Sequence, residues 1–313
     1  MRKLALVAVG GNALIRDSKH STIPDQIETV AETCTHIASI IESGWDVIVT
    51  HGNGPQVGFL LLMSEIASKT VHPIPLDTAG ADTQGAIGYW MQQALHNEFV
   101  RRGMTKKAVT VVTQVVVKPD DPAFLKPSKP VGPFYSEEDA RRYQQERGWA
   151  VKEDAGRGWR RVVPSPLPYE IAEIDPIKAL VNAGFVVVAG GGGGIPVVRD
   201  GDGMLRGVEG VIDKDYASAL LAAGVGANAF VITTAVEKVA LNYNKPNQMD
   251  VDRLTVEEAR KHLEDGQFPE GSMGPKIRAA IQFLEKGGDE VIITSPEALG
   301  RAIEGTTGTR ITR

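Results

Sequence analysis

Short apolar runs alternate with longer segments of helical period along most of the chain. The apolar runs cover residues 4–9, 46–50, 108–117, 185–190, 229–234 and 290–294. One segment of helical period follows Pro24, and four others cover residues 55–68, 82–103, 215–224 and 274–287. Strands that are apolar on both faces are typical of a parallel sheet that lies between helices. The pattern predicts an α/β fold, a three-layer αβα sandwich with a mainly parallel central sheet, formed by one domain over residues 1–313.

One segment interrupts this alternation. Residues 118–164 are rich in proline, charged and aromatic residues, and they include the run KPSKPVGPFYSEEDARRY. A long non-repetitive segment inside a compact domain is uncommon, and it usually belongs to a functional lid or to an inserted subdomain. We therefore expect residues 118–164 to form a small inserted lid subdomain, after which the chain returns to the main sheet.

Composition and charge narrow the class of protein. The chain has 313 residues, of which 42% are hydrophobic and 23% are charged, and this length suits an α/β domain with a sizeable core. Its formal net charge of −5 gives no bulk attraction to nucleic acid or to an anionic membrane. We expect neither as a partner, so a phosphate site has to be built from a local group of residues.

The N-terminal segment and the single cysteine bear on location and chemistry. The apolar stretch at residues 4–9 is short, no small-residue cleavage site follows it, and no apolar run of the chain approaches about 18 residues. We therefore expect a cytoplasmic protein without a transmembrane helix. Cys34 cannot form an intrachain disulfide and lies in a segment of helical period, so neither cysteine redox catalysis nor a zinc site is indicated.

Glycine-rich loops follow three of the predicted strands. They lie at residues 10–12, 52–54 and 190–194, and the third loop consists of five consecutive glycines. In open α/β sheets ligands bind beyond the carboxyl ends of the strands, where glycine lets backbone N–H groups approach an anion closely. Three such loops favour a phosphate cradle, although each loop alone also suits a tight strand-to-helix turn. None of them matches the Walker or the dinucleotide-binding pattern.

Two lysines stand at the predicted starts of helices. Lys214 follows Asp213 at one start, and Lys276 follows Pro275 at another. A cation at a helix N-terminus opposes the helix dipole by about 0.3–1 kcal/mol, so local helix stability explains neither lysine. Either both point into solvent, or an anion lies between them and the free N–H groups. Asp215 then either favours the helix start or holds the two lysines in place for phosphoryl transfer.

A series of motifs covers nearly the whole chain in order: GGNAL, THGNGPQVG, DTAGADTQGAIGYW, DPAFLKPSKPVGPFYSEEDA, GWRRVVPSP, GGGGIPV, GVIDKDYASALL and EGSMGPK. In these motifs the chain resembles the carbamate kinase family, which has the amino acid kinase fold. The segments KPVGPFYSEE and GWRRVVPSP are especially specific, because other amino acid kinases share the glycine loops but lack them. The resemblance implies reversible phosphoryl transfer between carbamoyl phosphate and ADP, with Mg²⁺ on the phosphates of ATP or ADP, and a homodimer.

The resemblance also implies roles for individual residues. Lys129 reaches over carbamoyl phosphate as a lid cation, Lys214 and Lys276 neutralise the transferring phosphoryl group, and Asp215 organises the lysines. The implied substrate-binding residues are Gly10, Gly11, Asn12, Gly52, Asn53 and Gly54. The implied nucleotide-binding residues are Gly191, Gly192, Tyr243, Met273 and Gly274. No protein metal site is expected, because the nucleotide phosphates carry the Mg²⁺.

Other candidate residues have a structural interpretation. We expect Arg160 and Arg161 to pair with neighbouring carboxylates rather than with substrate phosphate. His51 is expected to be a packed or hydrogen-bonded residue, because transfer from an already anionic carbamate needs no proton abstraction.

The chain departs from the family pattern at two positions. Ala235 replaces an acidic residue and Ala240 replaces an aromatic one, which leaves the affinity for the nucleotide and the base preference open. Two alternative functions therefore stay in view: a sister kinase of the same fold that acts on another small acceptor, and a non-catalytic nucleotide or metabolite sensor. The direction of the reaction in the cell is open as well.

Overall fold

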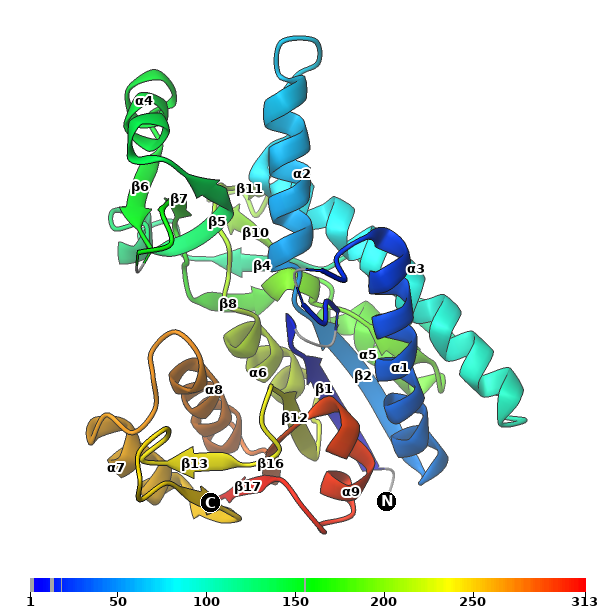
Figure 1. Ribbon diagram of the computed structural model, residues 1–313. Coiled ribbons are helices and arrows are strands. Elements are labelled where there is room, and N and C mark those ends of the chain that lie inside the picture. Colours follow the sequence, from blue (N-terminus) through cyan, green and yellow to red (C-terminus); the bar gives the residue numbers. More distant parts are fainter. Residues whose placement is uncertain (1–2, 12–13, 18, 155) are drawn as a thin grey trace.

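The computed structural model describes residues 3–11, 14–17, 19–154 and 156–313, in which the largest element is an eight-stranded sheet (Figure 1). In spatial order its strands are β15 (Arg253–Thr255), β17 (Thr309–Thr312), β16 (Glu290–Thr294), β12 (Ala229–Thr233), β1 (Lys3–Val9), β2 (Trp45–His51), β9 (Val186–Val188) and β3 (Ala108–Thr110). The strands from β16 to β3 are parallel, whereas β17 runs antiparallel to β16 and is followed by the edge strand β15. The predicted mainly parallel central sheet is confirmed.

Helices cover both faces of this sheet. Successive strand residues point to opposite sides, so that Leu4 and Leu6 belong to one core cluster and Ala5 and Val7 to the other. The first cluster lies under α5 (Ile174–Asn182), α6 (Lys214–Val225), α7 (Val256–Glu264) and α8 (Met273–Glu285). The second lies under α1 (Ile23–Glu42), α3 (Leu76–Arg101) and α9 (Leu299–Ile303). The predicted three-layer αβα sandwich is confirmed.

The apolar run at residues 108–117 is divided between two sheets, so its prediction as one strand was wrong. Residues 108–110 form β3, whereas β4 (Gln114–Val117) belongs to a second sheet. In spatial order this second sheet contains β11 (Leu205–Gly207), β10 (Ile195–Arg199), β4 and β8 (Pro168–Ile171). The chain leaves the first sheet at Thr113, whose N–H donates to Oε1 of Gln84 at 2.7 Å instead of to a strand.

The segment that interrupts the alternation folds on itself. The described residues of segment 118–164, called the inserted subdomain below, include β5 (Lys129–Tyr135), α4 (Glu137–Arg147), β6 (Ala150–Glu153), β7 (Trp159–Val163) and the short helix η2 (Pro122–Phe124). The strands form an antiparallel sheet in the order β5-β7-β6. In Figure 1 this sheet stands beside α2 (Gly54–Ala67), the helix that projects beyond the carboxyl end of β2.

A small hairpin completes the C-terminal half. It consists of β13 (Val239–Leu241) and β14 (Met249–Val251), and its connection contains Tyr243. Two short 3₁₀ helices lie at strand ends, η3 (Gly191–Gly193) after β9 and η4 (Pro296–Ala298) after β16. Within the described residues, no helix combines the length and the apolar character that a membrane crossing requires.

Candidate active site

The carboxyl ends of several central strands and the starts of two helices meet at one end of the sheet, which is called the strand edge below. Because β1, β2, β9 and β12 are parallel, the loops that follow them lie at the same edge. The N–H of Gly10 donates to Oγ1 of Thr233 at 3.0 Å, and the N–H of Gly52 donates to the carbonyl of Val9 at 3.0 Å. A Cβ on Gly52 would lie 3.9 Å from the nitrogen of Gly11. The first two glycine loops are therefore brought together as predicted, whereas Asn12 lies outside the described residues.

Helix N-termini add donors to this edge. Helix α2 begins at Gly54 directly after Asn53, and α6 begins at Lys214 directly after Asp213. Asp213 caps α6, since its Oδ1 accepts the N–H of Asp215 at 2.9 Å. The start of a helix carries free N–H groups and partial positive charge, which favour a bound anion. The predicted start of α6 is confirmed.

Two lysines share one buried carboxylate at the edge. Lys214 Nζ lies 2.7 Å from Oδ1 of Asp215, and Lys276 Nζ lies 2.9 Å from Oδ2 of the same residue. Asp215 is only 4% exposed, and both lysine side chains are largely buried. Neither lysine points freely into solvent. We call these three side chains the Lys–Asp–Lys cluster.

The cluster is charged at neutral pH. Burial opposes ionisation of Asp215, but the ammonium groups of Lys214 and Lys276 outweigh it and hold the pKa of this carboxyl below its usual range. The two cations and one anion leave a net charge of +1, fixed by direct ion pairs. A fixed positive charge beside free N–H groups is suited to stabilising the charge of a phosphoryl group during its transfer.

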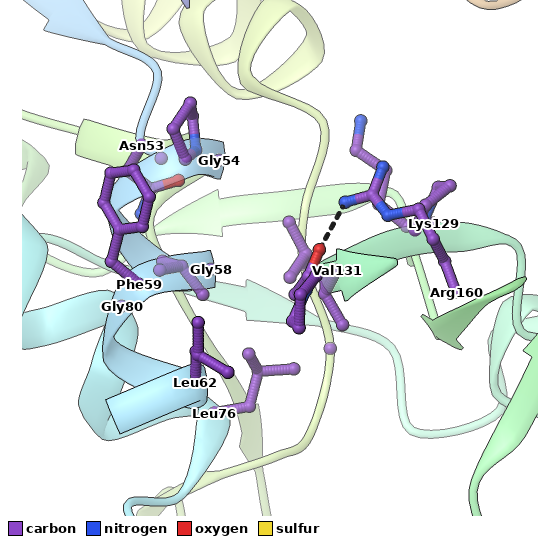
Figure 2. A pocket seen from close by; sticks show the side chains of 18 of the residues that line it. Asn53, Gly54, Gly58, Phe59, Leu62, Leu76, Gly80, Lys129, Val131 and Arg160 are labelled. Carbon is purple, nitrogen blue, oxygen red and sulfur yellow. Dashed lines mark hydrogen bonds between the residues drawn. The ribbon is translucent and has the colours of Figure 1, made fainter. Parts of the chain in front are cut away.

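A cavity of about 470 Å³ opens between α2 and the inserted subdomain (Figure 2). Phe59 and Leu62 of α2 line one side, and Lys129 and Arg160 of the inserted subdomain line the other. Lys129 Nζ also contacts Oδ2 of Asp213 at 2.8 Å. The inserted subdomain is thereby joined to the start of α6, two residues from the shared carboxylate.

A smaller cavity of about 120 Å³ lies at Lys276. It is lined by Gly10, Gly11, Thr233, Thr234, Ala235, Lys276 and Pro296. Ala235 thus lines a cavity that Lys276 also lines. Lys129 lines the large cavity and Lys276 the small one, so cations of the candidate site reach both.

The predicted nucleotide-binding residues are only partly brought together. Met273 and Gly274 begin α8, the helix that carries Lys276, and a Cβ on Gly274 would lie 3.2 Å from the carbonyl oxygen of Pro269. Tyr243 lies on the separate β13–β14 hairpin with half of its surface exposed. It is not among the described residues that line either cavity.

The five consecutive glycines are required by conformation and by close packing. Positive φ angles, which residues other than glycine rarely adopt, occur at Gly190, Gly192, Gly193 and Gly194. A Cβ on Gly191 would overlap the ring of His51, and one on Gly192 would overlap the amide of Asn53. Gly192 and Gly194 also line the large cavity. The loop therefore joins the strand ends closely and leaves a cavity wall without side chains.

The arginines of β7 pair with carboxylates, as predicted. Arg161 forms an ion pair with Glu209. Arg160 donates from Nη2 to the carbonyl of Gly132 at 3.0 Å, and its Nη1 lies 3.7 Å from Oδ2 of Asp154.

His51 is packed into the core of the site. It is 1% exposed, and its Nδ1 makes a 2.8 Å hydrogen bond with the carbonyl of Gly52. Burial lowers its pKa to about 4, against an ordinary value of 6.5, and the positive charge of Lys214 acts in the same direction. The imidazole is therefore neutral at pH 7, where it has the packed role that the sequence predicts.

This pKa predicts a loss of stability in mild acid. Because the folded state lowers the pKa of His51, its contribution is complete above pH 6.5 and is lost as the pH falls toward 4. Between about pH 7.5 and about pH 5 the loss amounts to about 2 kcal/mol. Urea unfolding at the two pH values measures it. His51→Asn should remove this part of the pH dependence, whereas the exposed His72→Asn should leave it in place; equal behaviour of the two variants would contradict the assignment.

Sequence reasoning missed Gln84, which supports the glycine loop. Its Nε2 donates to the carbonyl of Gly191 at 2.9 Å and to that of Thr113 at 3.1 Å, while its Oε1 accepts the N–H of Thr113. Gln84 is 2% exposed. A glutamine on the apolar side of a helical segment is the signal that points to such a role, because a buried amide needs partners.

Comparison with known proteins gives the family. The sequence profile of the amino acid kinase family matches residues 3–295, and the chain belongs to this family. Within it, the chain is similar over nearly its full length to carbamate kinases, as the motifs indicated. The carbamate kinase of Pyrococcus furiosus is 50% identical over 313 residues, which cover 99% of both chains. The carbamate kinase-like protein YahI of Escherichia coli is 49% identical over 314 residues, again with 99% of both chains covered.

A solved structure agrees with the sequence comparison. The carbamate kinase from Giardia lamblia bound to AMP-PNP superposes with a TM-score of 0.94. It is 40% identical in sequence, and the match covers 99% of this chain and 98% of the other.

Proposed function

We propose that this protein is a carbamate kinase, which transfers the phosphoryl group of carbamoyl phosphate reversibly to ADP and yields ATP and carbamate. Carbamate then decomposes to ammonia and carbon dioxide. The observation that carries the proposal is the Lys–Asp–Lys cluster at the strand edge, where Asp215 binds Lys214 and Lys276 at 2.7 and 2.9 Å. The full-length similarity to carbamate kinases supports the same activity.

The residues divide the work of phosphoryl transfer. Such reactions depend on positioning and on neutralisation of charge, and little covalent chemistry falls to the protein. We assign charge neutralisation to Lys214 and Lys276, their placement to Asp215, and contact with carbamoyl phosphate to Lys129, with the inserted subdomain as a lid. The loops at residues 10–12 and 52–54 supply donors to carbamoyl phosphate. The small cavity and the start of α8 are assigned to the nucleotide.

Mg²⁺ belongs to the proposal as the ion that bridges the nucleotide phosphates. Among the residues that the structure describes, no group of three or more His, Cys, Asp or Glu side chains is placed to hold a metal ion. We assign the ion to phosphate oxygens because the resemblance to carbamate kinases implies it, and the protein contributes the lysines around them. A cytoplasmic location is proposed as well.

A second candidate function is transfer to another small acceptor. The large cavity, about 470 Å³ with Phe59 and Leu62 on its wall, offers more apolar surface than carbamate occupies. Ala235 lines the small cavity, and the sequence leaves the affinity for the nucleotide open at this position. If a larger carboxylate, or a larger carbamate, accepts the phosphoryl group as fast as carbamate itself does, the sister kinase is favoured.

The decisive experiment is ATP formation by the purified protein from ADP, carbamoyl phosphate and Mg²⁺. We expect rapid ATP formation that is lost in Lys276→Ala, a control that excludes contaminating kinases. If the protein forms no more ATP than a reaction without protein, the carbamate kinase assignment is wrong, and other acceptors have to be screened.

We also propose a homodimer. Light scattering coupled to gel filtration would contradict it by showing a species of 33.6 kDa, the mass of one chain.

A further inference from the structure

Glu65 is a largely covered carboxylate that neither the sequence nor the proposed reaction explains. It lies in the last turn of α2, and its side chain is 13% exposed. The C-terminal end of a helix carries partial negative charge, which opposes an acidic side chain there. Helix stability therefore does not account for Glu65, and its partners have to.

The partners of Glu65 come from the inserted subdomain. The hydroxyl of Tyr135 donates to its Oε2 at 2.9 Å, and Arg147 Nη1 lies 3.7 Å from its Oε1. Glu65 also raises the pKa of the Tyr143 hydroxyl, which places a third polar group of the subdomain beside the same carboxylate. One side chain of α2 thus interacts with the end of β5 and with two residues of α4.

An aromatic cluster makes these contacts rigid. The ring centroids of Tyr135 and Tyr143 lie 5.4 Å apart, and those of Tyr143 and Trp149 lie 5.0 Å apart. The guanidinium of Arg147 lies 4.5 Å from the ring of Tyr143 and 5.2 Å from that of Trp149. Because these side chains fix one another, a contact of Glu65 with any of them orients the whole subdomain.

Strand β5 connects this contact to the candidate active site. It begins with Lys129 and ends with Tyr135, and a bulge interrupts its pairing with β7 between Val131 and Tyr135. Between them Gly132 has a φ of +73° and lies against α2, where a Cβ on Gly58 would be 3.7 Å from its Cα. The strand thus rests on α2 at Gly132 and is held at one end by Glu65, while its other end carries Lys129.

We propose that Glu65 is a positioning residue: through Tyr135 and Arg147 it fixes the inserted subdomain on α2 and thereby places the Lys129 ammonium group beside the transferred phosphoryl group. The inference rests on the role of Lys129 given under the proposed function. It assigns to α2 two tasks, one at each end, because Asn53 and Gly54 at its start contact the large cavity.

The test is a double-mutant cycle with Lys129. Tyr135→Phe removes only the hydroxyl and keeps the ring in its cluster. We expect kcat/KM for carbamoyl phosphate to fall about tenfold, as suits a buried hydrogen bond to a charged group, and KM for ADP to stay within about twofold. In a Lys129→Ala background the same change should cost less than about twofold, since a positioning residue has nothing left to position.

Two further variants sharpen the test. Glu65→Ala should reproduce the loss, and Glu65→Gln, which keeps an oxygen acceptor for Tyr135, should recover most of it. The exposed Glu146→Gln on α4 is the matched control and should match the wild type. Thermal unfolding verifies that each variant is folded.

The outcomes separate the two proposals. If Lys129→Ala alone loses activity but Tyr135→Phe costs the same factor with and without Lys129, the positioning role of Glu65 is wrong and the role of Lys129 stands. If Lys129→Ala keeps full activity, both roles are wrong, while carbamate kinase activity itself is still decided by the ATP assay.

Discussion

Replacing Lys214 or Lys276 with alanine is expected to lower the kcat of ATP formation by a factor on the order of 10³ or more. Each ammonium group lies within 3 Å of the carboxylate of Asp215, at 2.7 and 2.9 Å, and is therefore already in place before substrate binds. A cation that needs no reorganisation stabilises the transition state more than the ground state. Steady-state kinetics with saturating ADP and carbamoyl phosphate measure the effect.

The matched control is Lys106→Ala. Lys106 also pairs with a carboxylate, Asp46, at 2.9 Å, but Asp46 lies in the first part of β2, away from the strand ends that form the site. We expect its kcat to stay within about twofold of the wild type, because a partly exposed pair of this kind contributes little beyond local stability. A kcat within about threefold of the wild type for Lys214→Ala and Lys276→Ala would remove both lysines from the mechanism.

The central sheet was predictable because its strands are buried on both faces. Residues 4–9, 46–50, 229–234 and 290–294 are apolar apart from polar residues at some of their ends, and all four formed strands of the parallel region. The antiparallel strand β17 was not predicted, because Thr309–Thr312 is short and contains one apolar residue, Ile311. Pairing with β16 decides its structure, and such a pairing is not visible locally.

Tertiary contacts also decided the boundaries that the sequence misplaced. The helix expected from residue 82 begins at Leu76, which is 4% exposed and belongs to a small cluster with Val57 and Val131. The strand break at Thr113 depends on Gln84, which lies 29 residues earlier. Neither partner can be inferred from hydrophobic period alone, because both contacts join segments that are distant in the chain.

Within the candidate site, the sequence offered the pairing of the lysines as one of two alternatives. It singled out Lys214 and Lys276 as cations that helix stability does not explain, and the structure joins both to Asp215, Lys276 across 61 residues of the chain. Glu65 escaped notice because an acidic residue in a helical segment is ordinary until its burial is known. Tyr243 was assigned by resemblance alone, and its nucleotide contact stays a prediction.

The second large effect is expected for substitutions in the glycine loop, where neighbouring positions should differ in their effects on stability and on activity. Gly193→Ala is expected to lower the free energy of unfolding by about 4 kcal/mol, because a Cβ there would overlap the backbone carbonyl of Ile212 and φ is +91°. The three atoms nearest to a Cβ on Gly192 all belong to the side chain of Asn53, so we expect a smaller loss, about 1–2 kcal/mol from the φ of +68° and about 1 kcal/mol from the displaced amide. Urea unfolding measures both values.

The loss of activity per folded molecule should be larger for Gly192→Ala than for Gly193→Ala, the opposite of the order in stability. In Gly192→Ala the side chain of Asn53, which lines the large cavity, is displaced and loses its 2.9 Å hydrogen bond to Thr83. We therefore expect kcat/KM for carbamoyl phosphate, per folded molecule, to fall about tenfold or more. Gly266→Ala is the matched control, because Gly266 has the same φ of +68° with open space around its Cβ position. It should lose about 1–2 kcal/mol of stability from its φ alone and keep full activity. If Gly192→Ala behaves like Gly266→Ala in both measurements, the loop is only a turn and does not shape the site.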